Sequence, residues 1–243
     1  MTYSARRPCR GVLFDKDGTL VDFRGTWLPR YRGAAAEIAA RAGHSPALAT
    51  VLLERLGYDA SAGRFAADSP LLWDTNAAVA ARWAAMPEVA GRVDAREVAD
   101  RHFADHARYP PVGVGDLPPV LSGLRAAGLA LGLATMDDTA NAHDTAARLG
   151  IAHLLDFVTG ADAGHGAKPG PGMALAFCAD RGLDPAEVAV VGDTRVDLTM
   201  ARAAGCGLAV AVLTGGTPRQ AVEDFADHVL DDVHGLPALL SIA

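Results

Sequence analysis

Two aspartates at the end of an apolar run are the residues of this chain best suited to chemistry. Asp15 and Asp17 follow the run Val12–Phe14 and are followed at once by Gly18. The run predicts the end of a buried strand, and the glycine predicts a tight turn. Since open α/β sheets bind ligands at the carboxyl ends of their strands, both carboxylates are expected at that edge. Like charges this close need a cation or a proton between them, and a hard ion such as Mg2+ fits best.

Two other interpretations of this stretch compete with a metal site. A calcium-binding EF-hand loop requires glycine at its sixth position and glutamate at its twelfth. Counted from Asp15, Gly18 is fourth and Thr26 is twelfth, so this interpretation fails. A plain surface turn, which aspartate and glycine favour, stays open on these residues alone.

Two downstream segments repeat the pattern of a strand followed by a polar side chain. Thr135 follows the apolar run 129–134, and its hydroxyl with neighbouring backbone N–H groups could bind phosphate oxygens. Asp193 follows the run 188–191, and Asp197 lies four residues later, on the same face of the next predicted helix. Helix capping explains one of these aspartates well and both less well.

Lys168 stands just before a predicted helix, in a loop whose glycines permit close backbone approach. It supplies a point charge for a phosphate or for the carboxylate of Asp15, although an ordinary solvated lysine is the alternative. Carboxylates, a lysine and a small hydroxyl at one sheet edge suit phosphoryl transfer through a covalent aspartyl-phosphate. In such a reaction one carboxylate attacks, a second handles the proton, and a metal neutralises charge.

Strands and helices alternate along most of the chain and must position these residues. Strands are predicted at 11–15, 129–134, 157–159, 188–191, 208–213 and 229–230, and helices at 117–127, 139–149, 171–181 and 195–204. Buried apolar strands that alternate with helices predict an α/β fold, a doubly wound (Rossmann-like) parallel sheet covered on both faces.

The stretch from 27 to 109 lacks strand-like runs and carries apolar stripes at helical spacing. It predicts an inserted all-α helical-bundle cap domain. The predicted division is 1–21 and 116–243 for the α/β core and 22–115 for the cap. Linkers near 21–26 and 109–116 are expected to act as hinges, and residues 1–10 as a loose lead-in.

The composition of the chain limits the kinds of molecule that it is expected to bind and the compartment in which it is expected to work. The formal charge of −7 argues against a nucleic-acid binder, so an anionic ligand needs local positive groups or a metal. The three cysteines, Cys9, Cys178 and Cys206, favour a reducing, cytoplasmic location over a disulfide framework. Neither a signal peptide nor a membrane-spanning stretch is recognised.

With these motifs in order, the chain resembles the haloacid dehalogenase superfamily of phosphohydrolases, and within it the phosphoglycolate phosphatase group. The resemblance implies Asp15 as nucleophile and metal ligand. It implies Asp17 as general acid/base, with its backbone carbonyl also on Mg2+. Asp193 would be the other protein ligand of the metal, with Asp197 supporting it through water or hydrogen bonds. Phosphate would be held by residues of two loops, Thr135, Met136 and Lys168.

Two residues depart from the pattern of this family. Lys16 stands where an apolar residue is common, and Met136 stands where asparagine is common. One hypothesis is that Lys16 adds positive charge for an acidic substrate; the alternative is a solvated lysine.

The residues and the resemblance are compatible with three functions. The leading one is a Mg2+-dependent phosphatase that hydrolyses a small phosphorylated metabolite. The second is a phosphomutase of the β-phosphoglucomutase type, and the third is a non-catalytic binding protein on the same scaffold. The expected partner is a small-molecule phosphate ester, without nucleic acid or membrane, and the expected assembly is a monomer or homodimer.

Several other polar residues are expected to be structural. His102 and His106 are spaced for a shared metal, but no third ligand is evident, which favours a solvated helix. Surface positions are expected for four arginines of the cap: Arg24, Arg30, Arg32 and Arg64.

Overall fold

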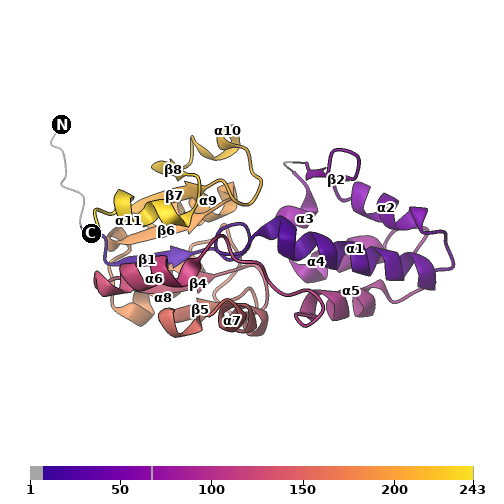
Figure 1. Cartoon of the computed structure of the whole chain (residues 1–243), viewed down its shortest axis with the longest axis horizontal. Helices are drawn as coiled ribbons and strands as arrows, with labels where there is room; N and C mark the ends of the chain where they lie inside the picture. Colours follow the sequence, from indigo (N-terminus) through magenta and orange to yellow (C-terminus); the bar gives the residue numbers. More distant parts are fainter. Residues whose placement is uncertain (1–7, 67, 243) are drawn as a thin grey trace. The chain divides into compact units, whose positions relative to one another are not determined.

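The computed structural model describes residues 8–66 and 68–242 (Figure 1). The chain divides into two compact units, one made of Met1–Phe23 with Pro111–Ala243 and the other of Arg24–Pro110. The sequence-based division was placed at 21/22 and 115/116. The lead-in predicted for residues 1–10 lies mostly outside the described residues. Within the described ranges, no helix is at once long and apolar enough to cross a bilayer.

A six-stranded parallel sheet forms the centre of the first unit, as the sequence predicts. Its strands run in the order β5-β4-β1-β6-β7-β8. Their bounds are β1 (Gly11–Phe14), β4 (Ala130–Ala134), β5 (Phe157–Thr159), β6 (Val188–Gly192), β7 (Leu208–Val212) and β8 (His228–Leu230). Because β1 lies between β4 and β6, it is buried on both faces and all four of its residues are buried.

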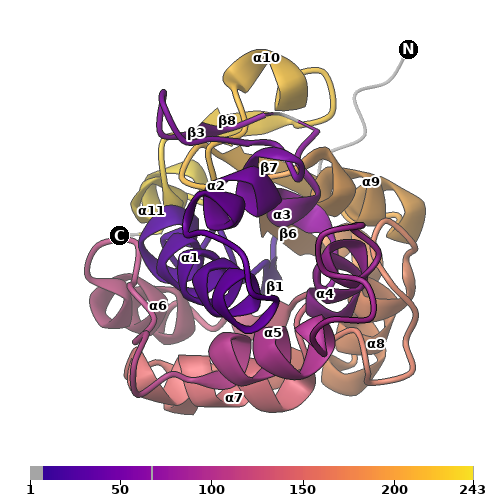
Figure 2. The same cartoon turned by 90° about the vertical axis from the view of Figure 1, so that its right-hand side faces the viewer.

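Helices cover both faces of this sheet, as Figure 2 shows for α6 and α11 on one side and α8 and α9 on the other. One face packs against α6 (Leu117–Ala126), α7 (Thr139–Arg148), η3 (Val233–Gly235) and α11 (Leu236–Leu239). The other packs against α8 (Gly172–Arg181), α9 (Arg195–Ala204) and α10 (Arg219–Val222). Side chains alternate along β1, so Val12 and Phe14 join the first core and Leu13 joins the second. The remaining short 3-10 turns are η1 (Ala152–Leu154) and η2 (Pro185–Glu187).

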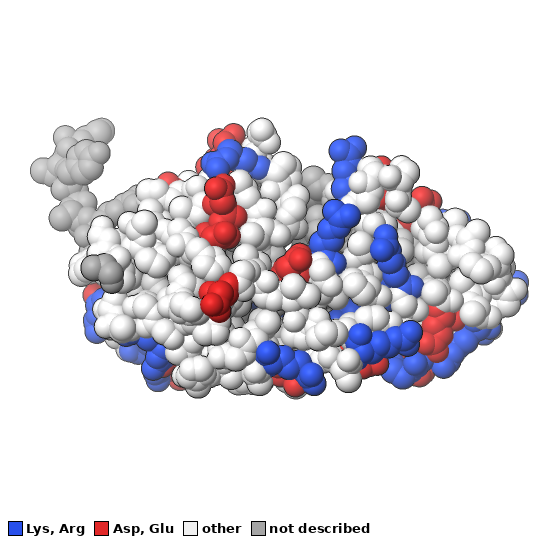
Figure 3. All heavy atoms as spheres, in the orientation of Figure 1, with Lys and Arg blue, Asp and Glu red and all other residues white. Residues whose placement is uncertain are grey.

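The second unit is mainly helical. Its helices are α1 (Phe23–Arg41), α2 (Ala47–Glu54), α3 (Pro70–Trp73), α4 (Asn76–Ala84) and α5 (Ala95–Ala104). A cluster of aromatic rings fills its interior, with Tyr31 of α1 stacked on Trp27 and in edge contact with Trp83 and Phe103. Aromatic packing of this kind supplies much of the buried apolar area of a small bundle. Exposed basic side chains are visible over this unit in the view of Figure 3.

Two expectations for this unit were wrong in detail. It is not purely helical, because β2 (Tyr58–Asp59) pairs antiparallel with β3 (Arg64–Phe65). The predicted linker 21–26 is partly helical, since α1 begins at Phe23 and runs through Pro29. Helix α4 begins at Asn76, where the Thr75 hydroxyl caps it by accepting the Ala78 N–H at 3.2 Å.

Candidate active site

The predicted catalytic residues of the first unit lie where three neighbouring strands end. Asp15 directly follows β1, Thr135 follows β4, and Asp193 follows β6. Since β1 pairs in parallel with both β4 and β6, their carboxyl ends meet at one edge of the sheet. The structure therefore brings together residues that are more than a hundred positions apart in the sequence, as the spacing of strands and polar residues predicts.

Three buried carboxylates form the core of the site. Oxygens of Asp15, Asp193 and Asp197 all lie within 4.8 Å of one another. The Oδ1 atom of Asp193 is buried and has no hydrogen-bond partner within the described part of the chain. A buried carboxylate oxygen without a donor is costly, and a hard cation is the partner that such an oxygen prefers. The donor set thus fits a divalent metal ion.

Lys168 is the cation of this cluster. Its ammonium donates to Asp15 Oδ1 at 2.5 Å and to Asp197 Oδ1 at 2.7 Å, and its side chain is only 1% exposed. A buried ammonium is stable only when it is paired, so the two carboxylates fix its position. The alternative of a solvated loop lysine is wrong.

Burial and mutual repulsion shift the protonation of the cluster. Burial, opposed by Lys168 and assisted by Asp197, raises the pKa of Asp15 to about 7. Burial, followed by the charges of Asp15 and Asp197, raises the pKa of Asp193 well above its ordinary value. Burial alone would lower the pKa of Lys168, but Asp15 and Asp197 raise it above its ordinary value. The metal-free site therefore disfavours full ionisation of its carboxylates, whereas a bound cation would favour it.

Close backbone approaches hold the carboxylates in place. A Cβ atom on Gly215, in the loop after β7, would overlap Asp193 Oδ2 and would lie 2.9 Å from Asp193 Cβ. Thr214 of the same loop donates its hydroxyl to the Gly18 carbonyl at 2.5 Å. Sequence reasoning missed this loop, although its Thr-Gly-Gly run after an apolar strand was a usable signal.

Asp197 both caps a helix and belongs to the carboxylate cluster. Its Oδ2 accepts the Thr194 hydroxyl at 2.6 Å in a capping box at the start of α9, while its Oδ1 accepts Lys168. Helix capping and a place in the carboxylate cluster are thus compatible, because each uses a different oxygen.

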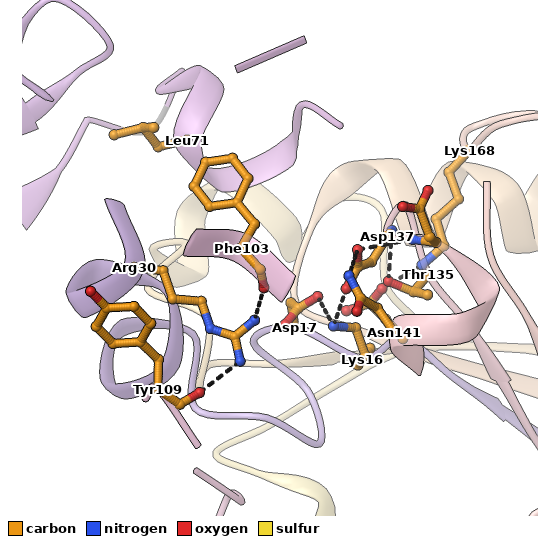
Figure 4. Close-up of polar contacts among 12 residues, drawn as sticks. Lys16, Asp17, Arg30, Leu71, Phe103, Tyr109, Thr135, Asp137, Asn141 and Lys168 are labelled. Carbon is orange, nitrogen blue, oxygen red and sulfur yellow. Dashed lines mark hydrogen bonds and ion pairs between the residues drawn. The ribbon is translucent and has the colours of Figure 1, made fainter. Parts of the chain in front are cut away.

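A second polar cluster surrounds Lys16 (Figure 4). Its ammonium lies 2.9 Å from Asp17 Oδ2 and 2.8 Å from Asp137 Oδ2, and its side chain is 3% exposed. The interpretation of Lys16 as a solvated lysine is therefore wrong. The carboxylate of Asp17, expected to share a cation with Asp15, is paired with Lys16 instead and does not belong to the three-carboxylate group.

The phosphate loop after β4 contains a residue that sequence reasoning missed. Asp137 is buried, and its backbone N–H donates to the Thr135 hydroxyl at 3.1 Å. Although burial alone would raise the pKa of Asp137, the Lys16 ammonium lowers it below the ordinary value. Met136 lies between Thr135 and Asp137 and is half-buried. The position of Asp137 just past a strand end was the signal that could have identified it.

The two histidines of α5 and the segment after it, His102 and His106, were expected to be solvated, and this expectation was wrong. His102 and His106 are both buried. The His102 ring lies with Nε2 2.8 Å from Glu37 Oε2 and Nδ1 3.1 Å from the Tyr109 hydroxyl. These contacts join α5 to α1, which gives His102 a structural role.

Arg30 is also buried, contrary to its expected surface position. It donates to the carbonyls of Phe103 at 2.5 Å and Tyr109 at 2.8 Å (Figure 4). It thereby satisfies one backbone carbonyl in the last turn of α5 and one in the segment that follows the helix. Its guanidinium also lies 5.0 Å from the Trp27 ring centroid. The surface positions expected for the other three arginines are confirmed: Arg24, Arg32 and Arg64.

Comparison with known proteins places these observations in a family. A model of the haloacid dehalogenase-like hydrolases matches residues 9–205. A phosphoglycolate phosphatase of Cupriavidus necator is 31% identical over 244 residues, which cover 97% of this chain and 95% of that protein. A phosphoglycolate phosphatase of Salmonella typhi is 29% identical over 216 residues, 81% of this chain and 79% of the relative.

Solved structures share the fold at lower identity. A haloacid dehalogenase-like hydrolase of Streptococcus pneumoniae has a TM-score of 0.71 and 18% identity, and the match covers 95% of this chain and 98% of that one. A phosphatase of the same superfamily from Thermococcus onnurineus has a TM-score of 0.68 and 21% identity, over 96% of this chain and 98% of that one.

Proposed function

The chain belongs to the haloacid dehalogenase-like hydrolase family, and from this premise we propose that it is a Mg2+-dependent phosphatase acting on a small phosphomonoester of the phosphoglycolate type. The observation that carries the metal and the mechanism is the buried group of Asp15, Asp193 and Asp197, with an Asp193 oxygen that no described donor satisfies. The relatives named phosphoglycolate phosphatases support the substrate class.

The metal would be held by side chains of Asp15 and Asp193 and by the backbone carbonyl of Asp17, with Asp197 supporting it. When bound there, Mg2+ supplies positive charge against the carboxylates and the phosphoryl oxygens. Lys168, already hydrogen-bonded to Asp15 Oδ1, orients the attacking carboxylate and offers a second positive charge to the phosphate. Thr135 and the backbone of Met136 would receive the remaining phosphate oxygens.

The reaction would proceed in two displacements at phosphorus. In the first, a carboxylate oxygen of Asp15 forms a bond to phosphorus, the ester P–O bond breaks, and Asp17 gives its proton to the leaving alcohol. In the second, Asp17 takes a proton from water, the water oxygen bonds to phosphorus, and the Asp15–phosphorus bond breaks. The sum is ester plus water giving alcohol plus inorganic phosphate, with both aspartates restored.

A phosphate-release screen over small phosphorylated metabolites tests this proposal. We expect turnover with Mg2+, none in EDTA, and none in the Asp15→Asn variant, which keeps the shape of the side chain but removes the nucleophile. Transfer of the phosphoryl group within a hexose phosphate, measured with a bisphosphate activator in a coupled assay, would identify a phosphomutase instead. Absence of turnover on the whole panel with Mg2+ would contradict the proposal and favour a binding protein.

A further inference from the structure

Lys16 has a specific role that follows from its contacts. We propose that Lys16 is a positioning residue for proton transfer, whose ammonium holds the carboxylate of Asp17 against Asp137 and so against the loop that carries Thr135. The inference rests on the proposed function, in which Asp17 is the general acid and base. It replaces a view of Lys16 as a cation that faces the substrate.

Lysine is rare in this chain, and both of its lysines are buried among carboxylates. Lys16 and Lys168 are its only lysines among 22 lysines and arginines, and both are buried in the first unit. Each ammonium contacts two carboxylates, Asp17 and Asp137 for Lys16 and Asp15 and Asp197 for Lys168. A lysine ammonium is compact and presents three donors, which suits it to bridging carboxylates from different loops.

Burial makes these contacts obligatory. The side chains of Lys16 and Asp137 are each 3% exposed, and that of Asp17 is 17% exposed. Removing a charge from water is unfavourable unless ion pairs compensate for the lost hydration. The ammonium is therefore held tightly between the two carboxylates, and Asp17 cannot turn away from it without leaving Lys16 with one fewer partner.

Hydrogen bonds hold the Asp137 carboxylate in place, so the ion pair between Asp137 and Lys16 has one partner whose position is fixed. Its Oδ1 accepts the Asp138 backbone N–H at 2.9 Å and the Asn141 side chain at 3.3 Å. Its own N–H donates to the Thr135 hydroxyl. Figure 4 shows this chain of contacts running from Asp17 through Lys16 and Asp137 to Thr135. The acid/base group is thus tied to the loop proposed to hold the phosphate.

The dependence of the rate on the leaving group distinguishes this role from others. Protonation by a general acid matters most for a poor leaving group and least for an activated one. Three esters separate the possibilities: phosphoglycolate, whose alcohol is poor and anionic; 2-hydroxyethyl phosphate, whose alcohol is poor and neutral; and p-nitrophenyl phosphate, which is activated. The quantity to compare is kcat/KM, because it reports the first displacement, in which the leaving group departs.

For Lys16→Met we expect kcat/KM to fall by about 10- to 100-fold for both alkyl esters and by less than about threefold for p-nitrophenyl phosphate. Lys16→Arg, which keeps the charge, should recover part of the loss on the alkyl esters. Adding Lys16→Met to Asp17→Asn should cause little further loss, since Lys16 acts through Asp17. The control is Arg125→Met, which removes a cation paired with Asp156 at 2.7 Å near the start of β5 and should leave the ratio between esters unchanged.

Two results would overturn the inference. An equal loss on all three esters would indicate a general structural role, and a loss confined to phosphoglycolate would indicate that Lys16 senses the substrate's charge. If the wild-type protein hydrolyses none of the esters, the proposed function fails, and a crystal structure of Lys16→Met then decides the inference by itself. A displaced Asp17 carboxylate would support positioning by Lys16, whereas an unmoved one would contradict it.

Discussion

Replacing Asp193 by asparagine should make the metal-free protein more stable while it abolishes metal binding. Asp193 is buried beside Asp15 and Asp197, and its Oδ1 has no partner among the described residues. The substitution keeps the size of the side chain, removes one of three clustered charges, and adds an N–H donor that the neighbouring carboxylates can accept. Most substitutions at buried positions destabilise a protein, so an increase in stability is a distinctive outcome.

The expected magnitude follows from the spacing of the carboxylates. Two unit charges separated by the 4.8 Å limit of this group repel each other by about 3 kcal/mol at an effective dielectric constant of about 20. Asp193 has two such neighbours, and the ammonium of Lys168 offsets part of their repulsion. An unsatisfied buried acceptor adds a cost of about 1–3 kcal/mol. We therefore expect Asp193→Asn to raise the free energy of unfolding in EDTA by about 1–3 kcal/mol.

The pH dependence has a definite sign. The folded-state pKa of Asp193 is raised above its ordinary 3.8, first by burial and then by Asp15 and Asp197. Folding is therefore penalised by this carboxyl group increasingly as pH rises above about 4, because the unfolded chain ionises it freely. Asp193→Asn removes that penalty. The stability difference between the variant and the wild type in EDTA should thus grow from pH 4 toward neutrality.

Thermal unfolding with and without Mg2+ measures these effects. In EDTA the variant should unfold at a higher temperature, by about 2–4 °C for each kcal/mol gained. Mg2+ should raise the unfolding temperature of the wild type and leave that of the variant unchanged. If Asp193→Asn were less stable than the wild type in EDTA, the carboxylate would have a stabilising partner and the reasoning about its unsatisfied oxygen would be refuted.

Three further predictions concern other buried contacts. Gly215→Ala should weaken Mg2+ binding by about 10- to 100-fold in calorimetric titration, because the new Cβ would displace the Asp193 carboxylate; unchanged affinity would contradict this. Hydrogen bonds from Arg101 and His102 lower the pKa of Glu37 to about 2, so its stabilising contribution, present above pH 4.5, should be lost as pH falls toward 2. Acid unfolding followed by circular dichroism should show a shallower dependence for Glu37→Gln over that range, and identical curves would count against it. Arg30→Met should lower the free energy of unfolding in urea by about 2–4 kcal/mol, because two backbone carbonyls lose charged donors; a loss below about 0.5 kcal/mol would show that water replaces them.

The fold and the strand-end residues could be predicted because each depends on a local pattern. A short apolar run followed by a polar residue recurs at Asp15, Thr135 and Asp193, and parallel strands place such positions at one edge. The predicted α/β architecture is confirmed by the parallel sheet, and the predicted enzyme class, a phosphoric monoester hydrolase, is supported by the family and its relatives. The assignments of individual catalytic roles stay predictions.

What could not be predicted depends on side chains that meet across loops. Lys16 and Asp137 are 121 positions apart, and no periodicity in either segment shows that their side chains pair. The strands β2 and β3 have two residues each, too few for an alternating pattern to be visible. Arg30 was expected at the surface because arginine is rarely buried. The carbonyls of Phe103 and Tyr109 that accept its hydrogen bonds come together only in the folded unit.

The distribution of charge accounts for why this chain would need a metal even though it contains two buried lysines. When Asp15, Asp193 and Asp197 are all ionised, as the bound metal would require, Lys168 neutralises one of the three carboxylates and leaves two negative charges. Lys16 cannot neutralise either of them, because its ammonium is bound by Asp17 and Asp137. Without a metal, a phosphate dianion entering the site in this ionised form would meet repulsion from both charges. A divalent cation offsets these two charges, so substrate binding itself, and not only the chemical step, should require Mg2+.

Phosphate binding measured by calorimetry on the Asp15→Asn variant, which removes one negative charge, should therefore depend less on Mg2+ than binding to the wild type. Equal dependence in both proteins would show that repulsion by the carboxylates is not what the metal relieves.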